Sequence, residues 1–230
     1  VMRNISLIAF DADDTLWECQ TYFESIEKEY CKLLSVYAPA EEVSKTLFAV
    51  ETANMPLLGY GSKAFLISLV ENAIEVSEGK LKANEVKKII ALGKELLELP
   101  AKPMDGVEET LKVLRESGKY NLVVFTKGEL LDQENKFHRS GLSTYFNDII
   151  VVSDKTEKSY HQLCEQFSVG VDQLLMVGNS FRSDIEPVLK LGGWAAHIPF
   201  HTIWLHEVVE EYEHPHLLKL DFFTQLKDAL

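Results

Sequence analysis

Hydrophobic positions follow two different periods along this chain. A short apolar run at residues 7–10 has the length and the Ile, Leu and Phe content of a strand buried on both faces of a sheet. From residue 21 the apolar positions recur at helical spacing, and no strand pattern interrupts them before residue 97. Four amphipathic helices are therefore predicted, at residues 21–36, 41–50, 63–76 and 84–97.

Turn-forming residues separate these helices and end the helical lobe. Breaks are expected at residues 38–39, 55–61 and 78–80, where proline or glycine occurs. Pro100 and Pro103 close the lobe, because two prolines three residues apart stop a helix and stiffen a connector.

The remainder of the chain alternates between strand and helix patterns. Strands are predicted at residues 121–125, 148–152, 173–177 and 194–198, and helices at residues 106–117, 129–140, 157–167 and 183–191. Residues 200–216 are expected to form a surface loop and a helix, and residues 217–230 a short edge strand and a last helix. Such alternation predicts a parallel sheet with helices on both faces. We therefore predict a doubly wound, Rossmann-like α/β core from residues 1–17 and 101–230, with residues 18–100 inserted as a helical domain.

Composition and charge narrow the class of protein. The hydrophobic fraction of 46% and the charged fraction of 26% are ordinary for a globular protein, and the formal net charge of −13 disfavours binding to nucleic acid. No apolar run reaches the length of a membrane span, and Cys19, Cys31 and Cys164 are scattered as reduced thiols would be. We expect a cytoplasmic monomer or homodimer that binds neither nucleic acid nor membrane.

Polar side chains follow each predicted strand of the core. Asp11 and Asp13 come directly after the first strand, and carboxylates this close repel one another unless a cation or a reaction uses them. Because the carboxyl ends of parallel strands share one edge of the sheet, the residues after the other strands become their neighbours. These are Thr126 after the second strand, Ser153 and Lys155 after the third, and Asn179 and Asp184 after the fourth.

These residues resemble, in order and spacing, the four motifs of the haloacid dehalogenase-like hydrolase superfamily. The motifs are residues 11–16 with the sequence Asp-Ala-Asp-Asp-Thr-Leu, then Thr126, Lys155, and residues 178–184. The helical domain resembles the α-helical cap of the phosphatase and dehalogenase branch. The resemblance implies a Mg²⁺-dependent hydrolase with a small phosphorylated substrate, such as a nucleotide or a sugar phosphate.

The resemblance also implies roles for single residues. Asp11 would be the nucleophile and form an aspartyl-phosphate, and Asp13 would be the general acid and base. Thr126 would bind the phosphoryl oxygens, helped by Lys127 and Gly128. Lys155 would neutralise the nucleophile and the phosphate. The expected Mg²⁺ ligands are Asp11, the backbone carbonyl of Asp13, Asn179 and Asp184.

Two departures from the family pattern leave alternatives open. Asn179 occupies a position that is usually acidic, which should weaken Mg²⁺ binding without abolishing it. The third motif is usually Lys-Pro, whereas this chain has Lys155-Thr156, so Lys158 is a rival for Lys155. Lys155 is favoured because it is closer to the strand end.

The substrate and the reaction class remain open. Asp13 favours phosphate ester hydrolysis over 2-haloacid dehalogenation, while a phosphomutase or a non-catalytic binding module of the same fold stays possible. In the helical domain, the loop of residues 59–63, with the sequence Gly-Tyr-Gly-Ser-Lys, makes Tyr60 and Lys63 candidate substrate contacts, although a plain interhelical turn is an equal alternative. Five histidines between residues 197 and 216 lack the spacing of a metal site and are expected to be surface or packing residues.

Overall fold

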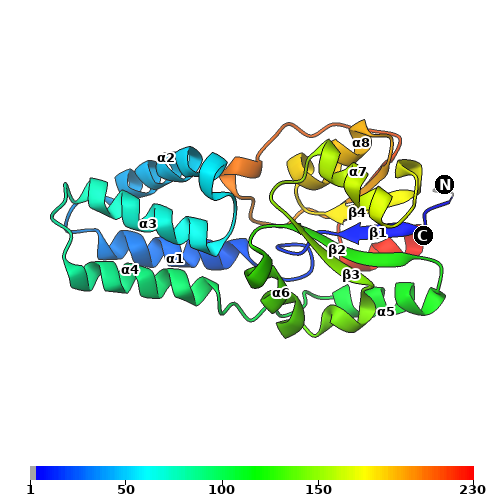
Figure 1. Ribbon diagram of the computed structural model, residues 1–230, viewed down its shortest axis with the longest axis horizontal. Coiled ribbons are helices and arrows are strands. Elements are labelled where there is room, and N and C mark those ends of the chain that lie inside the picture. Colours follow the sequence, from blue (N-terminus) through cyan, green and yellow to red (C-terminus); the bar gives the residue numbers. More distant parts are fainter. Residues whose placement is uncertain (1–3) are drawn as a thin grey trace. The chain divides into compact units, whose positions relative to one another are not determined.

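A computed structural model describes residues 4–230, which divide into two compact units. One unit contains the described residues up to Gln20 together with Pro100–Leu230, and the other is Thr21–Leu99. The sequence pattern placed the corresponding limits at 17/18 and 100/101. Figure 1 shows the course of the chain through both units.

The larger unit is built on a parallel sheet that has six strands within residues 4–230, in the order β3-β2-β1-β4-β5-β6. The strands are β1 (Leu7–Phe10), β2 (Asn121–Lys127), β3 (Asp148–Val152), β4 (Leu174–Gly178), β5 (Trp194–His197) and β6 (Leu217–Lys219). Strand β1 lies between β2 and β4, and all four of its residues are buried. The first apolar run of the chain is therefore a central strand.

Helices cover both faces of this sheet (Figure 1). They are α5 (Val107–Ser117), α6 (Leu130–Arg139), α7 (Glu157–Gln166), α8 (Glu186–Lys190) and α9 (Leu226–Ala229), with 3₁₀ turns at Leu142–Tyr145, Val171–Gln173, Leu205–Glu207 and Phe223–Gln225. Ile8 and Phe10 of β1 pack in one core cluster with residues of α5, α6 and α9, whereas Leu7 and Ala9 pack in a second cluster with α7 and α8. The doubly wound α/β class is confirmed, because successive strand residues point to opposite covered faces.

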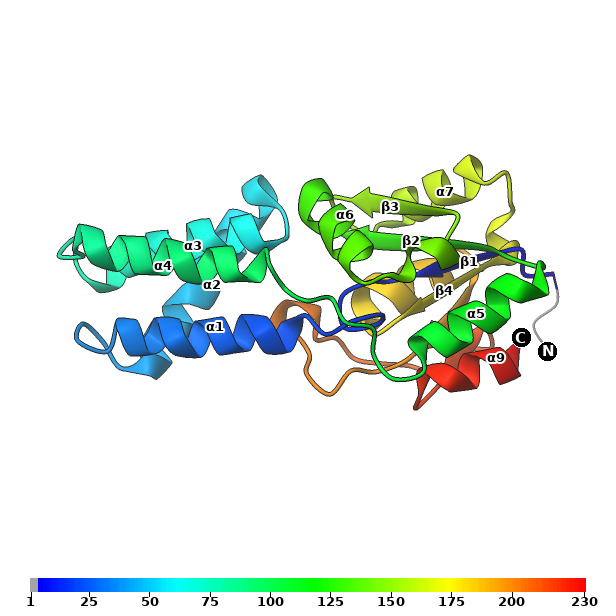
Figure 2. The ribbon, with the colours of Figure 1, turned by 90° about the horizontal axis from the view of Figure 1, so that it is seen from below.

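The smaller unit consists of four helices within residues 21–99, namely α1 (Gln20–Leu33), α2 (Ala40–Leu58), α3 (Ser62–Val76) and α4 (Ala83–Leu96). Figure 2 shows these helices from below. Buried hydrogen bonds link α1 to α3: the Tyr30 hydroxyl donates to the Leu69 carbonyl at 2.8 Å, and the Asn72 amide donates to the Tyr30 oxygen at 2.9 Å. These bonds provide partners for the Tyr30 hydroxyl and for the Asn72 amide nitrogen, polar groups that are costly to bury alone.

Two predictions about local structure are wrong. The helix expected to stop near residue 50 continues as α2 through Pro56 to Leu58. Pro56 is tolerated because it lies in the last turn, and the chain leaves the helix at Gly59, whose φ is +70°. Residues 200–216 form no α-helix and contain only the 3₁₀ turn Leu205–Glu207.

The segment of residues 200–216 is held by separate contacts with the core. Glu207 pairs with Lys127, and the Tyr212 ring packs edge-on against Phe181 with 5.0 Å between ring centres. Separate contacts of this kind, instead of one continuous apolar face of a helix, hold the segment against the core. No helix within residues 4–230 is both long and apolar enough to span a membrane.

Candidate active site

Three charged side chains from separate strand ends meet at the carboxyl edge of the sheet. Asp11 directly follows β1, Lys155 follows β3, and Asp184 lies in a π-helical turn, Phe181–Ile185, after β4. The Nζ atom of Lys155 lies 2.5 Å from Oδ1 of Asp11 and 2.6 Å from Oδ1 of Asp184. A single ammonium group therefore bridges two carboxylates.

The local backbone brings Asp184 over the end of β4. A Cβ atom at position 178 would lie 2.2 Å from Oδ2 of Asp184, so only glycine leaves room for the carboxylate there. The Ser180 backbone N–H donates to the same oxygen at 3.0 Å. The Tyr160 hydroxyl donates to the Ser183 carbonyl at 2.8 Å and anchors the π turn from α7. The sequence Gly178-Asn179-Ser180 thus orients Asp184 as well as ending the strand.

The charges of this cluster do not balance. Burial and the neighbouring Asp184 carboxylate raise the pKa of Asp11 to about 7, against the opposing influence of Lys155. Burial also disfavours the charged form of Lys155, but Asp11 and Asp184 outweigh it and raise the pKa of the ammonium. Two carboxylates with one ammonium leave an excess negative charge in a buried place, which a divalent cation would offset.

The residues around Asp11 fit a magnesium ion by the chemistry of their donor atoms. The Thr15 hydroxyl lies 3.3 Å from Oδ2 of Asp11 and 3.2 Å from Oδ1 of Asn179, so both oxygens border the same hydroxyl group. Among residues 4–230, no three His, Cys, Asp or Glu side chains form a metal-binding group by themselves. The set would consist of Asp11, Asp184, the Asn179 amide oxygen and the Asp13 carbonyl, and Mg²⁺ commonly takes water for its remaining positions.

Asp13 has a different set of partners from Asp11. Lys136 Nζ lies 2.7 Å from Oδ1 and 2.9 Å from Oδ2 of Asp13, Gln133 Nε2 donates to Oδ2 at 2.9 Å, and Trp17 Nε1 donates to Oδ1 at 2.9 Å. Burial would raise the pKa of Asp13, but the ion pair with Lys136 and these hydrogen bonds lower it. These contacts therefore favour the ionised form of the carboxylate and hold it in one orientation.

The residues at the end of β2 form hydrogen bonds with other groups of the protein. Thr126 is 1% exposed, and its hydroxyl oxygen accepts from Gln133 Nε2 at 3.0 Å. The Lys127 ammonium donates to Ser183 Oγ at 2.9 Å and pairs with Glu207. The Gly128 backbone N–H donates to the Val152 carbonyl at 3.2 Å. Phosphate binding by these three residues stays a prediction, and in this structure neither the Lys127 ammonium nor the Gly128 N–H is directed at Asp11.

Asp14 serves the backbone. Its carboxylate accepts from the N–H of Cys19 at 2.7 Å and from that of Gln20 at 3.0 Å, at the start of α1. Burial raises the pKa of Asp14 to about 7, although these two backbone donors oppose the shift. Its φ of +64° turns the chain away from β1. Asp14 therefore belongs to the entry of the first helix, where a carboxylate is a favoured cap.

The sequence analysis assigned no role to Gln133, Lys136, Ser183 or Glu207, which contact residues of the predicted site. For α6 there was a signal: its polar residues recur at helical spacing directly after a strand end. The helix buries Gln133 and Lys136, whereas Leu130 and Leu131 are 58% and 57% exposed. Phe137 of the same helix packs in the core, but the burial of these two polar side chains beside exposed leucines is atypical of a helix that only packs on a core. For Glu207, on an irregular segment far along the chain, no local pattern was available.

The other candidates lie elsewhere. Lys158 is exposed on α7, while Lys155 lies between the two carboxylates. Tyr60 and Lys63 belong to the helical unit, in the turn after α2 and the first turn of α3. Their contact with substrate stays a prediction. Two of the histidines serve packing and hydrogen bonding: His216 stacks on Trp194 with 4.2 Å between ring centres, and its backbone N–H donates to His214 Nδ1.

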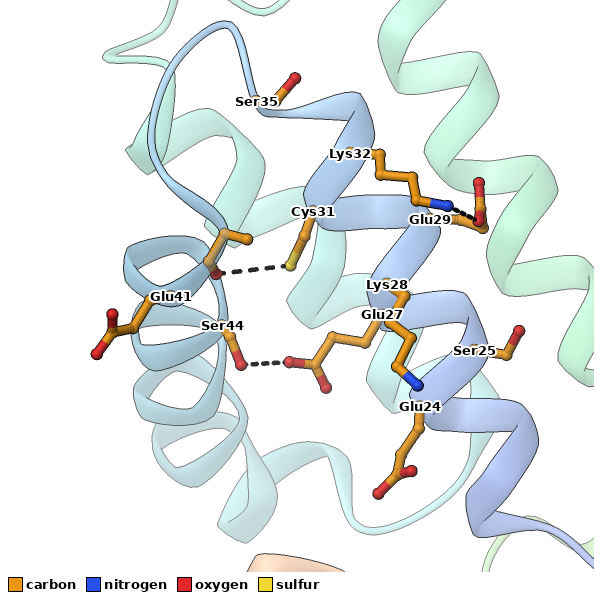
Figure 3. Close-up of a pocket in the computed structure, with 11 residues that line it drawn as sticks. Glu24, Ser25, Glu27, Lys28, Glu29, Cys31, Lys32, Ser35, Glu41 and Ser44 are labelled. Atoms are coloured by element: carbon orange, nitrogen blue, oxygen red, sulfur yellow. Dashed lines mark hydrogen bonds and ion pairs between the residues drawn. The ribbon is translucent and has the colours of Figure 1, made fainter.

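The helical unit also contains an open groove of ≈ 810 Å³ between α1 and α2 (Figure 3). Its walls are mostly charged, and Ser44 donates to Glu27 across it. Burial raises the pKa of the Cys31 thiol, which keeps this group protonated and weakly nucleophilic. The groove is therefore lined by surface side chains, and none of its lining residues forms a pair of nucleophile and base.

Comparisons with known proteins agree with this geometry. The family model of the haloacid dehalogenase-like hydrolases matches residues 5–192. A haloacid dehalogenase-like family hydrolase from Xanthomonas campestris is 34% identical, with a TM-score of 0.89 over 98% of this chain and 90% of that chain. A search of curated proteins found no match.

Two more distant structures share the fold. The HAD hydrolase YfnB from Bacillus subtilis, bound to magnesium, is 15% identical with a TM-score of 0.70, and 99% of each chain is covered. A 2-haloacid dehalogenase from Pseudomonas syringae pv. tomato is 17% identical with a TM-score of 0.66, covering 98% of this chain and 97% of that one. With four fifths of its length matched by the family model and a relative of 34% identity, the chain belongs to the haloacid dehalogenase-like hydrolases.

Proposed function

We propose that this hydrolase is a Mg²⁺-dependent phosphatase that cleaves a small phosphate monoester through an aspartyl-phosphate on Asp11. The observation that carries the proposal is the presence of a second carboxylate, Asp13, two residues after the one that Lys155 and Asp184 surround. Asp11 supplies a nucleophile, and Asp13 supplies a group that can move a proton. Phosphate ester hydrolysis requires both functions.

The reaction proceeds in two steps. A carboxylate oxygen of Asp11 attacks phosphorus, the bond from phosphorus to the ester oxygen breaks, and that oxygen takes a proton from Asp13, which must enter this step protonated although Lys136 favours its ionised form in the free protein. Water then attacks the phosphorus of the aspartyl-phosphate and gives a proton to Asp13, the bond from phosphorus to the Asp11 oxygen breaks, and inorganic phosphate leaves with the Asp11 carboxylate regenerated. Lys155 offsets negative charge throughout, because its ammonium already contacts Asp11.

Magnesium would be held by Asp11, Asp184, Asn179 and the Asp13 carbonyl. When bound, the ion supplies positive charge that lets an anionic nucleophile approach an anionic phosphate. Support for the metal comes from the donor oxygens of this site and from the magnesium-bound Bacillus subtilis relative.

The leaving group separates phosphatase from dehalogenase chemistry. A halide ion departs without a proton, so a dehalogenase gains nothing from an acid beside its nucleophile. An alkoxide is a poor leaving group and needs one. The fold alone does not distinguish a phosphatase from a dehalogenase, because a 2-haloacid dehalogenase has the same fold.

We propose that the helical unit selects the substrate, which would be of the nucleotide or sugar phosphate class. Tyr60 offers a ring for stacking, and Lys63 a charge for a second anion. Gly59 and Gly61, with φ values of +70° and +116°, give this turn a backbone that other residues rarely adopt.

The test combines a generic substrate with matched variants. The wild-type chain should release 4-nitrophenol from 4-nitrophenyl phosphate with Mg²⁺ and lose this activity in EDTA. Asp11→Asn should reduce turnover by at least about 10³-fold, while Asp105→Asn, which changes an exposed aspartate of the same unit, should leave it unchanged. Metal-independent turnover, or halide release from 2-chloropropionate in place of phosphate release, would refute the proposal.

A further inference from the structure

We propose that Lys136 and Gln133 of α6 are positioning residues that orient the Asp13 carboxylate for its two proton transfers. This inference rests on the proposed phosphatase function and adds two residues to it. Neither residue belongs to the four motifs that place the chain in its family.

The contacts fix the carboxylate completely. Oδ1 of Asp13 receives Lys136 Nζ at 2.7 Å and Trp17 Nε1 at 2.9 Å, and Oδ2 receives Lys136 Nζ at 2.9 Å and Gln133 Nε2 at 2.9 Å. Each oxygen thus has two donors, which come from α6 and from the segment after β1. Rotation of the carboxyl group about its bond to Cβ would break several of these bonds at once.

Gln133 links Asp13 to the end of β2. Its Nε2 atom lies 3.0 Å from Thr126 Oγ1 and 2.8 Å from the Lys127 carbonyl. A Cβ atom at position 128, where φ is +136°, would lie 3.1 Å from the same nitrogen. Gly128 therefore leaves space for the Gln133 amide, and the predicted phosphate-binding residue Thr126 shares a donor with Asp13.

Burial of Lys136 costs free energy that a purely structural role would not explain. The Lys136 side chain is 4% exposed, and an ammonium group at such a place gives up most of its hydration. The same helix leaves Leu130 and Leu131 more than half exposed. A helix selected for stability alone would bury its leucines and expose its lysine. The reversed placement is explained if Lys136 and Gln133 act on Asp13.

The chemistry requires this control of orientation. Asp13 must first give a proton to the ester oxygen and then accept one from the attacking water. The ester oxygen and the attacking water occupy, one after the other, the same apical position at phosphorus, opposite the Asp11 oxygen, so one carboxyl group must present an oxygen to the same place twice. Four donors on two oxygens hold it there.

The experiment separates the two steps. 4-Nitrophenolate leaves without protonation, so its release in the first turnover reports attack by Asp11, whereas continued turnover needs Asp13 as the base for water. For Lys136→Met we expect a burst of one 4-nitrophenol per folded chain, followed by turnover at least about tenfold slower than wild type. With an alkyl phosphate, whose leaving group needs the acid, the burst should be lost as well.

Three further variants serve as controls for Lys136→Met. Lys136→Arg should recover part of the turnover, because it restores a donor and the charge. Gln133→Leu should show the same pattern as Lys136→Met more weakly, and it carries the test if Lys136→Met fails to fold. Lys112→Met removes an exposed lysine of α5 and should behave as wild type.

The possible results are distinguishable. Turnover of both α6 variants within twofold of wild type would overturn the inference while leaving the phosphatase proposal intact. An equal loss of burst and of turnover with both esters would also overturn it, since that is the result of a structural role alone. A wild-type chain that releases phosphate from neither ester would overturn the proposed function itself.

Discussion

The ammonium group of Lys155 lies 2.6 Å from the Asp184 carboxylate, and each of these side chains is only 1% exposed. Lys155 also contacts Asp11, so its single charge serves both carboxylates. Removal of one member of a buried ion cluster leaves the others without compensation, and such changes cost about 3–5 kcal/mol in other proteins.

Lys155→Ala should therefore abolish phosphatase turnover and reduce the free energy of unfolding by a few kcal/mol. Lys158→Ala should alter neither, because Lys158 is exposed on α7. Phosphate release and urea denaturation measure the two effects. Loss of activity in Lys158→Ala alone would show that the wrong lysine has been assigned.

Asn179→Asp should tighten magnesium binding. The change converts a neutral amide oxygen, 3.2 Å from the Thr15 hydroxyl, into a charged ligand beside Asp11. We expect half-maximal activity at an about tenfold lower Mg²⁺ concentration, because ligand charge strengthens cation binding. Thermal unfolding provides a second measurement. Without Mg²⁺ the variant should unfold at a lower midpoint temperature than wild type, because of the added carboxylate, and with Mg²⁺ it should unfold at a higher one. A variant with unchanged Mg²⁺ dependence would place Asn179 outside the metal shell.

Glu207→Gln should loosen the segment of residues 200–216. The Glu207 carboxylate accepts from Ser180, Ser183 and Lys127, and its side chain is 10% exposed. Loss of the negative charge beside a largely buried ammonium should cost about 1–3 kcal/mol of unfolding free energy. Glu210→Gln, an exposed position on the same segment, is the control. Equal denaturation midpoints for the two variants would mean that the pair with Lys127 contributes no stability.

Glu51→Gln should make the stability of the protein less dependent on pH. Burial and the nearby Glu27 raise the pKa of Glu51 from 4.5 to about 7. The folded state therefore binds this proton more tightly than the unfolded state, and stability falls as pH rises from about 4.5 to 7 and stays reduced above that. The variant lacks this titration and should exceed wild type by about 1–3 kcal/mol at pH 8, with little difference at pH 4.

Urea denaturation at the two pH values measures this effect. Glu41→Gln, at an exposed position on the same helix, is the matched control and should follow wild type. A parallel pH dependence of wild type and Glu51→Gln would contradict the prediction.

Local periodicity was sufficient to predict the architecture of the core. Strand β3 lies at Asp148–Val152 as predicted, and the helices around it begin within a few residues of the predicted positions. The reason is that a buried parallel strand and an amphipathic helix each leave a short-range pattern. The same pattern failed at Pro56, because the effect of a proline depends on where the helix ends.

The grouping of the strand-end residues also followed from sequence, since all carboxyl ends of a parallel sheet lie at one edge. Asp11, Lys155 and Asp184 could thus be named as neighbours before any distance was known. What only the tertiary structure decided is which charge meets which: Lys136 reaches Asp13 across 123 positions of sequence, and Glu207 reaches Lys127 across 80. Such pairings depend on how helix α6 and an irregular segment pack against the sheet, and packing over that separation leaves no periodic trace in the chain.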